Sequence, residues 1–139
     1  MKINILFALI LFVSVVSCSK SNETPAPSNA AENISNYGSF GVYVRMYTAA
    51  GKGGSQAEVN IAYSADSLAN GLYIETKNAD SLGEVSFDNI DLGNNLTRRI
   101  YYNATLEYDG ENFKGENIAT LHQDRKIYGS VIVEPYEVK

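Results

Sequence analysis

Strict alternation of apolar and polar residues constrains the fold of this chain more than any other feature of its sequence. The longest alternation covers residues 98–108, with one face made of Ile100, Tyr102, Ala104, Leu106 and Tyr108. Successive side chains of a β-strand point to opposite faces, so this segment predicts a strand with one buried face. Asp109-Gly110 follows directly and is a strong signal for a two-residue hairpin turn.

Six further segments carry the same strand signal: 41–47, 57–63, 72–76, 85–87, 113–121 and 126–134. Between them, Ser64–Gly71 is expected to be a loop that holds one short helical turn. Asp88–Thr97 is expected to be a loop with Ile90 and Leu92 as apolar plugs. Short alternating strands without a convincing amphipathic helix predict an all-β fold, a seven-stranded antiparallel β-sandwich of immunoglobulin-like type.

The N-terminus carries an export signal instead of a strand signal. Lys2 precedes an apolar run, Ile5–Val16, that is shorter than the roughly 20 apolar residues needed to cross a membrane. Such a run is typical of a secretory signal peptide. Cys18, the only cysteine, ends it, and the segment resembles the lipobox of bacterial lipoproteins. We therefore expect Cys18 to be lipidated, with palmitate among its acyl chains.

Three parts follow from this signal: a lipoprotein signal peptide (1–17), a lipidated flexible linker (18–36) and a β-sandwich domain (37–139). The linker has Pro25 and Pro27 among Ser, Asn, Ala and Glu, a composition that does not form a packed core. Lipoproteins kept in the inner membrane often carry Asp after the cysteine, and Ser19 stands there. The resemblance thus implies a lipid-anchored outer-membrane protein of the cell envelope, facing either the periplasm or the exterior.

Charge and cysteine content argue against a nucleic-acid partner and against a disulfide-based fold. Removal of residues 1–17 leaves 10 basic against 16 acidic residues, a net charge of −6. A mildly acidic chain without a basic block does not attract phosphate backbones, so nucleic acid is not expected as a partner. A single cysteine provides no disulfide framework, and the fold must therefore depend on its apolar core.

Few residues point to chemistry. His122 is the only histidine, whereas a metal site needs several converging donors. We therefore expect His122 to be a turn residue and not a metal ligand. We therefore expect no metal and no cofactor. The acids Glu107, Asp109 and Glu111 cluster at the predicted hairpin, where solvated charge normally collects, although their spacing does not rule out glycoside chemistry. No serine has a credible base, so no catalytic residue is assigned.

One group of residues resembles a known family. It comprises Gly51, Ala57-x-Val59, Asp80-x-x-Gly83-x-Val85-x-Phe87, Tyr102-x-Ala104 and Tyr108-Asp109-Gly110. This pattern is similar to the carboxypeptidase-regulatory-like domains, a prealbumin-like group of β-sandwiches related to collagen-adhesin B-type repeats. It covers about Val42 to Val133. The resemblance implies a prealbumin-like sandwich, and such domains are mostly non-catalytic accessory or adhesive modules.

Two sets of residues are candidates for surface function. Tyr43, Tyr47 and Tyr101 fall on the expected outer faces, where aromatic rings can stack on sugars or anchor an interface. Ser67 and Ser81 lie in Asp-Ser-Leu tripeptides that resemble a short O-glycosylation motif. The sequence thus favours a non-enzymatic binding module with a protein or glycan partner. The alternatives are a structural subunit of an envelope assembly and, least favoured, an envelope hydrolase.

Overall fold

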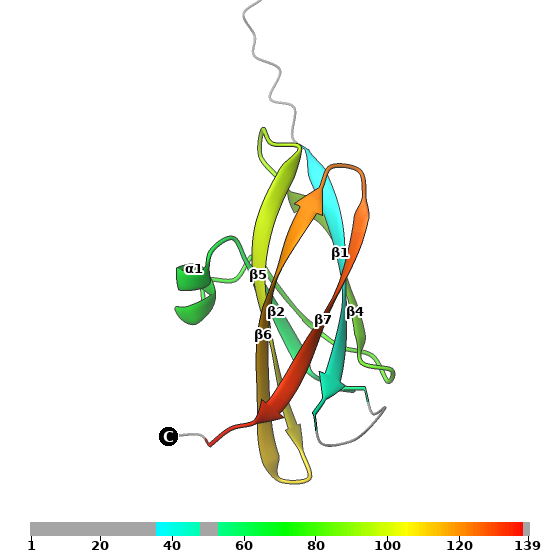
Figure 1. The fold of residues 1–139 in the computed structure, drawn as a ribbon, viewed down its shortest axis with the longest axis vertical. Coiled ribbons are helices and arrows are strands. Elements are labelled where there is room, and N and C mark those ends of the chain that lie inside the picture. The colour runs from blue at the N-terminus through cyan, green and yellow to red at the C-terminus, as the bar shows by residue number, and fades with distance from the viewer. Residues whose placement is uncertain (1–35, 48–52, 138–139) are drawn as a thin grey trace, which may run out of the picture. The chain divides into compact units, whose positions relative to one another are not determined.

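The protein is described here by a computed structural model that covers residues 36–47 and 53–137. Its elements are β1 (Tyr37–Met46), β2 (Glu58–Ala62), α1 (Ala65–Ala69), β3 (Glu75–Asn78), β4 (Glu84–Asp91), β5 (Thr97–Tyr108), β6 (Glu111–His122) and β7 (Lys126–Pro135) (Figure 1). The expected all-β fold is confirmed, and so is the short helical turn between the second and third strands. The expected signal peptide, Cys18 and the linker up to residue 35 lie outside the described residues.

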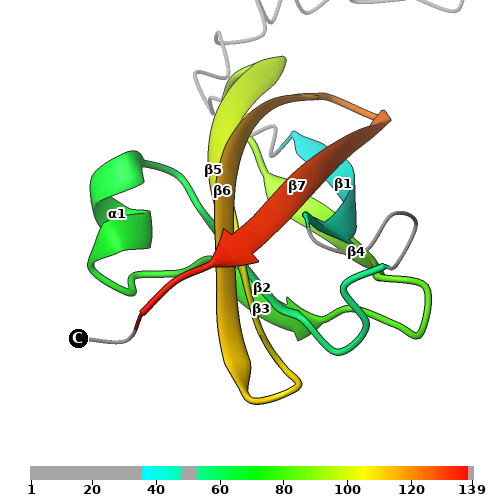
Figure 2. The same cartoon turned by 60° about the horizontal axis from the view of Figure 1, so that its bottom comes forward.

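The seven strands form one sheet in the order β3-β2-β5-β6-β7-β1-β4. Its two edge strands approach each other, since Lys77 Nζ on β3 donates to the Ser86 carbonyl on β4 at 3.0 Å. The sheet is therefore nearly closed, like a barrel, with α1 standing outside it beside β5 (Figure 2). The expectation that all strands are antiparallel is wrong for one pair, because β1 and β7 run parallel. Residue alternation predicts faces but carries no information on strand direction.

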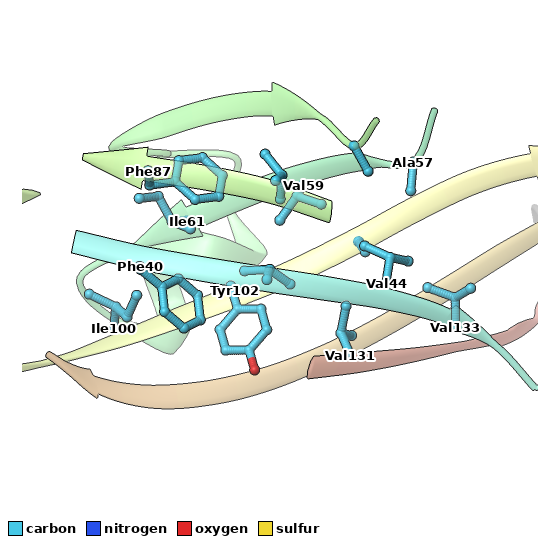
Figure 3. Packing of buried hydrophobic residues seen from close by; sticks show 14 of the residues in the cluster. Phe40, Val44, Ala57, Val59, Ile61, Phe87, Ile100, Tyr102, Val131 and Val133 are labelled. Atoms are coloured by element: carbon cyan, nitrogen blue, oxygen red, sulfur yellow. The ribbon is translucent and has the colours of Figure 1, made fainter. Parts of the chain in front are cut away.

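An apolar core lies inside this curled sheet. The inward side chains of β1 are Phe40, Val42, Val44 and Met46, all buried; the alternation predicted one shared face for the last three. Phe40 packs edge-on against Tyr102 of β5, with ring centroids 4.9 Å apart (Figure 3). A Cβ added to Gly129 of β7 would lie 2.7 Å from the Tyr102 hydroxyl oxygen, so this glycine makes room for the ring.

The fourth strand is longer than expected, because a β-bulge interrupts the apolar–polar alternation before its second half. Val85 and Phe87 point inward as predicted, and then the pairing with β1 shifts register between Gly38 and Phe40. Asn89 lies in this shift with a φ of 57°. The extra residue moves Ile90 back to the inner face, so the strand continues to Asp91. Ile90 and Leu92 are buried, as expected, but Ile90 belongs to a strand.

The third strand also differs from the expectation. It covers Glu75–Asn78, later than the expected 72–76, and Leu72 is exposed. Ile74 alone of the predicted apolar face packs against the core, and its N–H donates to the Ile61 carbonyl at 2.8 Å. A short segment with three alternating positions fits several registers, so its bounds were weakly determined.

The side chain of Asp80 organises the turn before β4. One carboxylate oxygen of Asp80 accepts hydrogen bonds from the backbone N–H groups of Leu82 and Glu84, at 2.8 and 2.9 Å. Gly83 has a φ of 81° and lies so close to β1 that an added Cβ would be 2.7 Å from the Val44 carbonyl oxygen. Gly83 is therefore required both for its backbone conformation and for the close approach.

The ladder between β6 and β7 covers only Phe113↔Pro135 and Lys114↔Glu134. Further along this seam, the side chain of Asn117 takes the place of a strand partner. Its Nδ2 donates to the Ser130 carbonyl at 2.9 Å, and its Oδ1 accepts from the Ile118 N–H at 2.9 Å. Asn117 thereby satisfies one backbone group on each strand where the sheet opens.

Candidate binding surface

The outer faces of β1 and β7 lie side by side and carry three tyrosines, of which Tyr47 and Tyr128 are exposed and Tyr43 is half-buried. Parallel pairing sets Gly41 beside Tyr128, Tyr43 beside Ser130 and Arg45 beside Ile132. Tyr47 follows β1, and its N–H donates to the Val133 carbonyl at 3.1 Å, which keeps it beside β7. We call this surface the tyrosine face; its members are Tyr43, Arg45, Tyr47, Lys126, Tyr128 and Ile132.

Tyr128 is the central residue of the tyrosine face. Its ring rests against the backbone of Gly41, because a Cβ added there would lie 2.6 Å from Tyr128 Cδ1. The Tyr43 ring lies beside it, with centroids 6.2 Å apart and planes tilted by 34°. Tyr128 nevertheless remains 61% exposed. The ring is held from below and from one side, and much of its surface is open to solvent.

Polar groups border this aromatic pair. Lys126 Nζ lies 5.7 Å from the centre of the Tyr128 ring and donates to Ser86 Oγ of β4 at 2.9 Å. Glu84 of β4 pairs with Tyr43 across the ladder and is exposed. An ammonium, a hydroxyl and a carboxylate therefore surround the two rings, so the face can both stack and form hydrogen bonds.

Of the three expected binding tyrosines, the structure brings together only Tyr43 and Tyr47, both on the β1 side of this face. Tyr47 is 71% exposed. Tyr101 lies on β5, which is separated from β1 by β6 and β7 in the strand order. It is half-buried under α1 and lines a separate hollow of about 370 Å³ with Leu68, Ile118, Glu116 and other residues. The three tyrosines do not form one patch.

Tyr128 was missed by the sequence reasoning, although a signal for it existed. The last expected strand, 126–134, carries Ile127, Val131 and Val133 at alternate positions, and this alternation places Tyr128 on the opposite face. Its position beside Tyr43 depends on the parallel pairing of β1 with β7. That pairing joins the first and last strands and leaves no local signal in the sequence.

A row of polar side chains crosses the outer face of the sheet on the other strands. Asn60 of β2 is directly opposite both Thr76 of β3 and Asn103 of β5. Thr76 Oγ1 donates to Asn60 Oδ1 at 2.6 Å, and Asn60 Nδ2 donates to Asn103 Oδ1 at 3.1 Å. Both asparagines are buried, at 2% and 6% exposure. The row satisfies its own polar atoms, which makes it a structural rather than a binding feature.

The two candidate glycosylation serines have different surroundings. Ser67 is half-buried in α1, and its Oγ accepts from Ser64 Oγ at 2.8 Å near the N-cap. Ser81 is exposed in the turn that Asp80 organises, and its neighbour Leu82 is exposed as well. Ser81 is therefore the more accessible hydroxyl of the two.

The titratable residues singled out from the sequence lie at opposite ends of β6. His122 ends β6, where its carbonyl accepts from the Arg125 N–H at 3.3 Å. Glu107, Asp109 and Glu111 are exposed around the β5–β6 hairpin, and Asp109 has a φ of 53°, as its turn requires. The described part of the chain holds no group of three or more His, Cys, Asp or Glu side chains that could bind a metal ion.

Burial and pairing shift the pKa values of two tyrosines and one lysine. Burial raises the pKa of Tyr102, whose hydroxyl donates to the Ser130 carbonyl at 3.0 Å. Burial also raises the pKa of Tyr63, against the opposing effect of the Arg98 guanidinium, which stacks 3.4 Å from its ring centre. The hydrogen bond to Glu116 raises the pKa of Lys114, an exposed ion pair at 2.7 Å. These pKa shifts result from the packing of the two tyrosines and from an ion pair on the surface.

Comparisons of the chain with protein-family models, with curated proteins and with solved structures each gave no match. Within residues 36–47 and 53–137, no helix is long and apolar enough to cross a membrane. The tyrosine face must therefore be interpreted from its own residues.

Proposed function

We propose that the chain is a non-enzymatic outer-membrane lipoprotein whose strand domain acts as an accessory or adhesive binding module for a protein or glycan. The observation that carries this proposal is the Tyr43–Tyr128 pair, which lies on an outer sheet face and is flanked by Arg45 and Lys126. Tyr and Arg are enriched at binding hot spots. A tyrosine held in place by Gly41 also loses little conformational entropy when it binds.

The anchor is the second part of the proposal. A signal run that ends at the lone Cys18 supports lipidation, and Ser19 supports transfer to the outer membrane. Metabolic labelling with an alkyne fatty acid should label the wild-type protein, whereas the Cys18→Ala variant should remain unlabelled. An unlabelled wild-type protein would refute the lipid anchor but would not bear on the fold.

The finer classification as a prealbumin-like, carboxypeptidase-regulatory-like sandwich belongs to this proposal as well. It is supported by the Asp80–Phe87 segment, in which Gly83 has a positive φ and Val85 and Phe87 enter the core. These positions shape the backbone, in keeping with a domain whose characteristic residues are structural. The O-glycosylation proposed for the Asp-Ser-Leu tripeptides is expected at the exposed Ser81 in preference to the half-buried Ser67.

Capture from the protein's own cell envelope tests the binding role. The full lipoprotein in detergent should retain a protein or glycan partner, and Tyr128→Ala should abolish this retention. Tyr136→Ala is a matched control, because Tyr136 is also exposed but lies outside the tyrosine face. Retention that is absent in the wild type, or equal in all three proteins, would contradict a binding role for this surface.

A further inference from the structure

We infer that the tyrosine face binds a carbohydrate without net charge, through stacking of a sugar ring on Tyr128. This inference rests on the proposed binding function and adds the chemical class of the ligand. Its basis is the combination of one anchored aromatic ring, a border of polar groups and a balanced set of charges on one surface.

The first argument concerns the ring itself. Gly41 lies under the Tyr128 ring, and Tyr43 lies beside it, so the ring has a defined position before any ligand arrives. The face of an aromatic ring carries partial negative charge and attracts partially positive groups. The C–H bonds on one side of a pyranose ring are such groups. A sugar that stacks here would therefore meet a surface that needs no rearrangement.

The second argument separates a carbohydrate from a protein partner. The exposed groups that border the Tyr43–Tyr128 pair include Lys126, Ser86, Ser130 and Glu84. Lys, Glu and Ser are depleted in the buried cores of protein interfaces, since each would have to lose its hydration there. A polyhydroxylated ligand can instead replace this hydration, because its hydroxyl groups both donate and accept hydrogen bonds.

The third argument concerns charge. On the outer faces of β1, β7 and the part of β4 before the bulge, residues 84–87, the cations Arg45 and Lys126 are balanced by the anions Glu84 and Glu134. The chain after Cys18 is also acidic overall. Neither the face nor the whole protein has the positive charge that attracts an anionic polymer. The face also has no excess of acidic residues that would favour a cationic one. A neutral glycan matches these charges best.

A glycan array probed with the full lipoprotein in detergent tests the inference. We expect binding to neutral glycans, with affinity reduced roughly tenfold or more by Tyr128→Ala, as for the loss of one aromatic hot-spot residue. Tyr136→Ala should bind like the wild type. Gly41→Ala should also weaken binding, because its Cβ would displace the Tyr128 ring; in the Tyr128→Ala background it should have no further effect.

Three results would overturn the inference. Binding to acidic glycans only would refute the charge argument. Neutral binding that survives Tyr128→Ala would refute the role of this face. Absence of all glycan binding would refute the carbohydrate ligand, and envelope capture then decides the wider proposal. A protein captured through Tyr128 would leave the binding module intact, whereas capture of nothing would refute both.

Discussion

The close contact between Gly129 and Tyr102 makes a quantitative prediction about stability. An alanine Cβ at position 129 would lie 2.7 Å from the Tyr102 hydroxyl oxygen and 3.0 Å from the tip of the Phe40 ring. The backbone of Gly129 has no positive φ, so the cost of Gly129→Ala is steric. Overpacking of this kind lowers the free energy of unfolding by about 2 kcal/mol.

Removal of the obstructing oxygen should reduce that cost. Tyr102→Phe alone loses the hydrogen bond to the Ser130 carbonyl, worth about 1 kcal/mol, while Asn117 still donates to the same oxygen. In the Tyr102→Phe background, the atom nearest to the Cβ that Gly129→Ala adds is absent, and the Phe40 ring remains in contact. We therefore expect the double variant to lose about 1 kcal/mol less free energy of unfolding than the sum of the two single losses.

Urea unfolding followed by far-ultraviolet circular dichroism measures this coupling, since the chain has no tryptophan. Gly110→Ala is the matched control: Gly110 has a φ of 77°, and nothing lies within 4 Å of an added Cβ. That substitution should cost about 1 kcal/mol through backbone strain, equally in both backgrounds. Additive losses for Gly129→Ala and Tyr102→Phe, or a neutral Gly129→Ala, would refute the packing argument.

Three further predictions concern polar contacts and pH. Asn117→Ala should lower the free energy of unfolding by about 1 kcal/mol, since it removes the acceptor of the Ile118 N–H and one of the two donors to the Ser130 carbonyl; an unchanged urea midpoint would contradict this. Asn60→Leu or Asn103→Leu alone should each lower the free energy of unfolding by about 1–3 kcal/mol, because each single variant leaves the other buried asparagine without its partner. The double variant should lose less than the sum of the two; strict additivity in this double-mutant cycle would contradict the prediction. The pKa values of Tyr63 and Tyr102 are raised in the folded state, so the unfolded phenols ionise first and the urea midpoint should fall as pH rises beyond about 10; a midpoint that held or rose in this range would argue against these shifts.

Local patterns in the sequence predicted the faces of the strands well. Val42, Val44 and Met46 are buried as their alternation required, and Asp109-Gly110 turns with positive φ at both residues. Alternation succeeds here because one face of each strand lies against a single apolar core. The same reasoning failed at Asn89, where one extra residue reversed the alternation and made a strand resemble a loop.

Features that depend on distant residues were not predictable in this way. The parallel pairing of β1 with β7 decides that Tyr43 lies beside Tyr128 and not beside Tyr101. The near closure of the sheet likewise depends on contacts between β3 and β4, such as that from Lys77 to Ser86. Single-residue patterns contain neither strand order nor direction, so the candidate surface could be assembled only from the three-dimensional arrangement.

The same β1–β7 ladder has a consequence for biogenesis. The ribosome makes β1 before the other strands of the domain, yet one of its long edges finds its partner only when Lys126–Pro135 has emerged. Until then β1 has no neighbour on that side, and the sheet cannot be completed. Ladders that join distant parts of a sequence also form slowly. A nascent domain of this design therefore stays open until β7 has been synthesised, and a product cut short before β7 should be cleared by proteases.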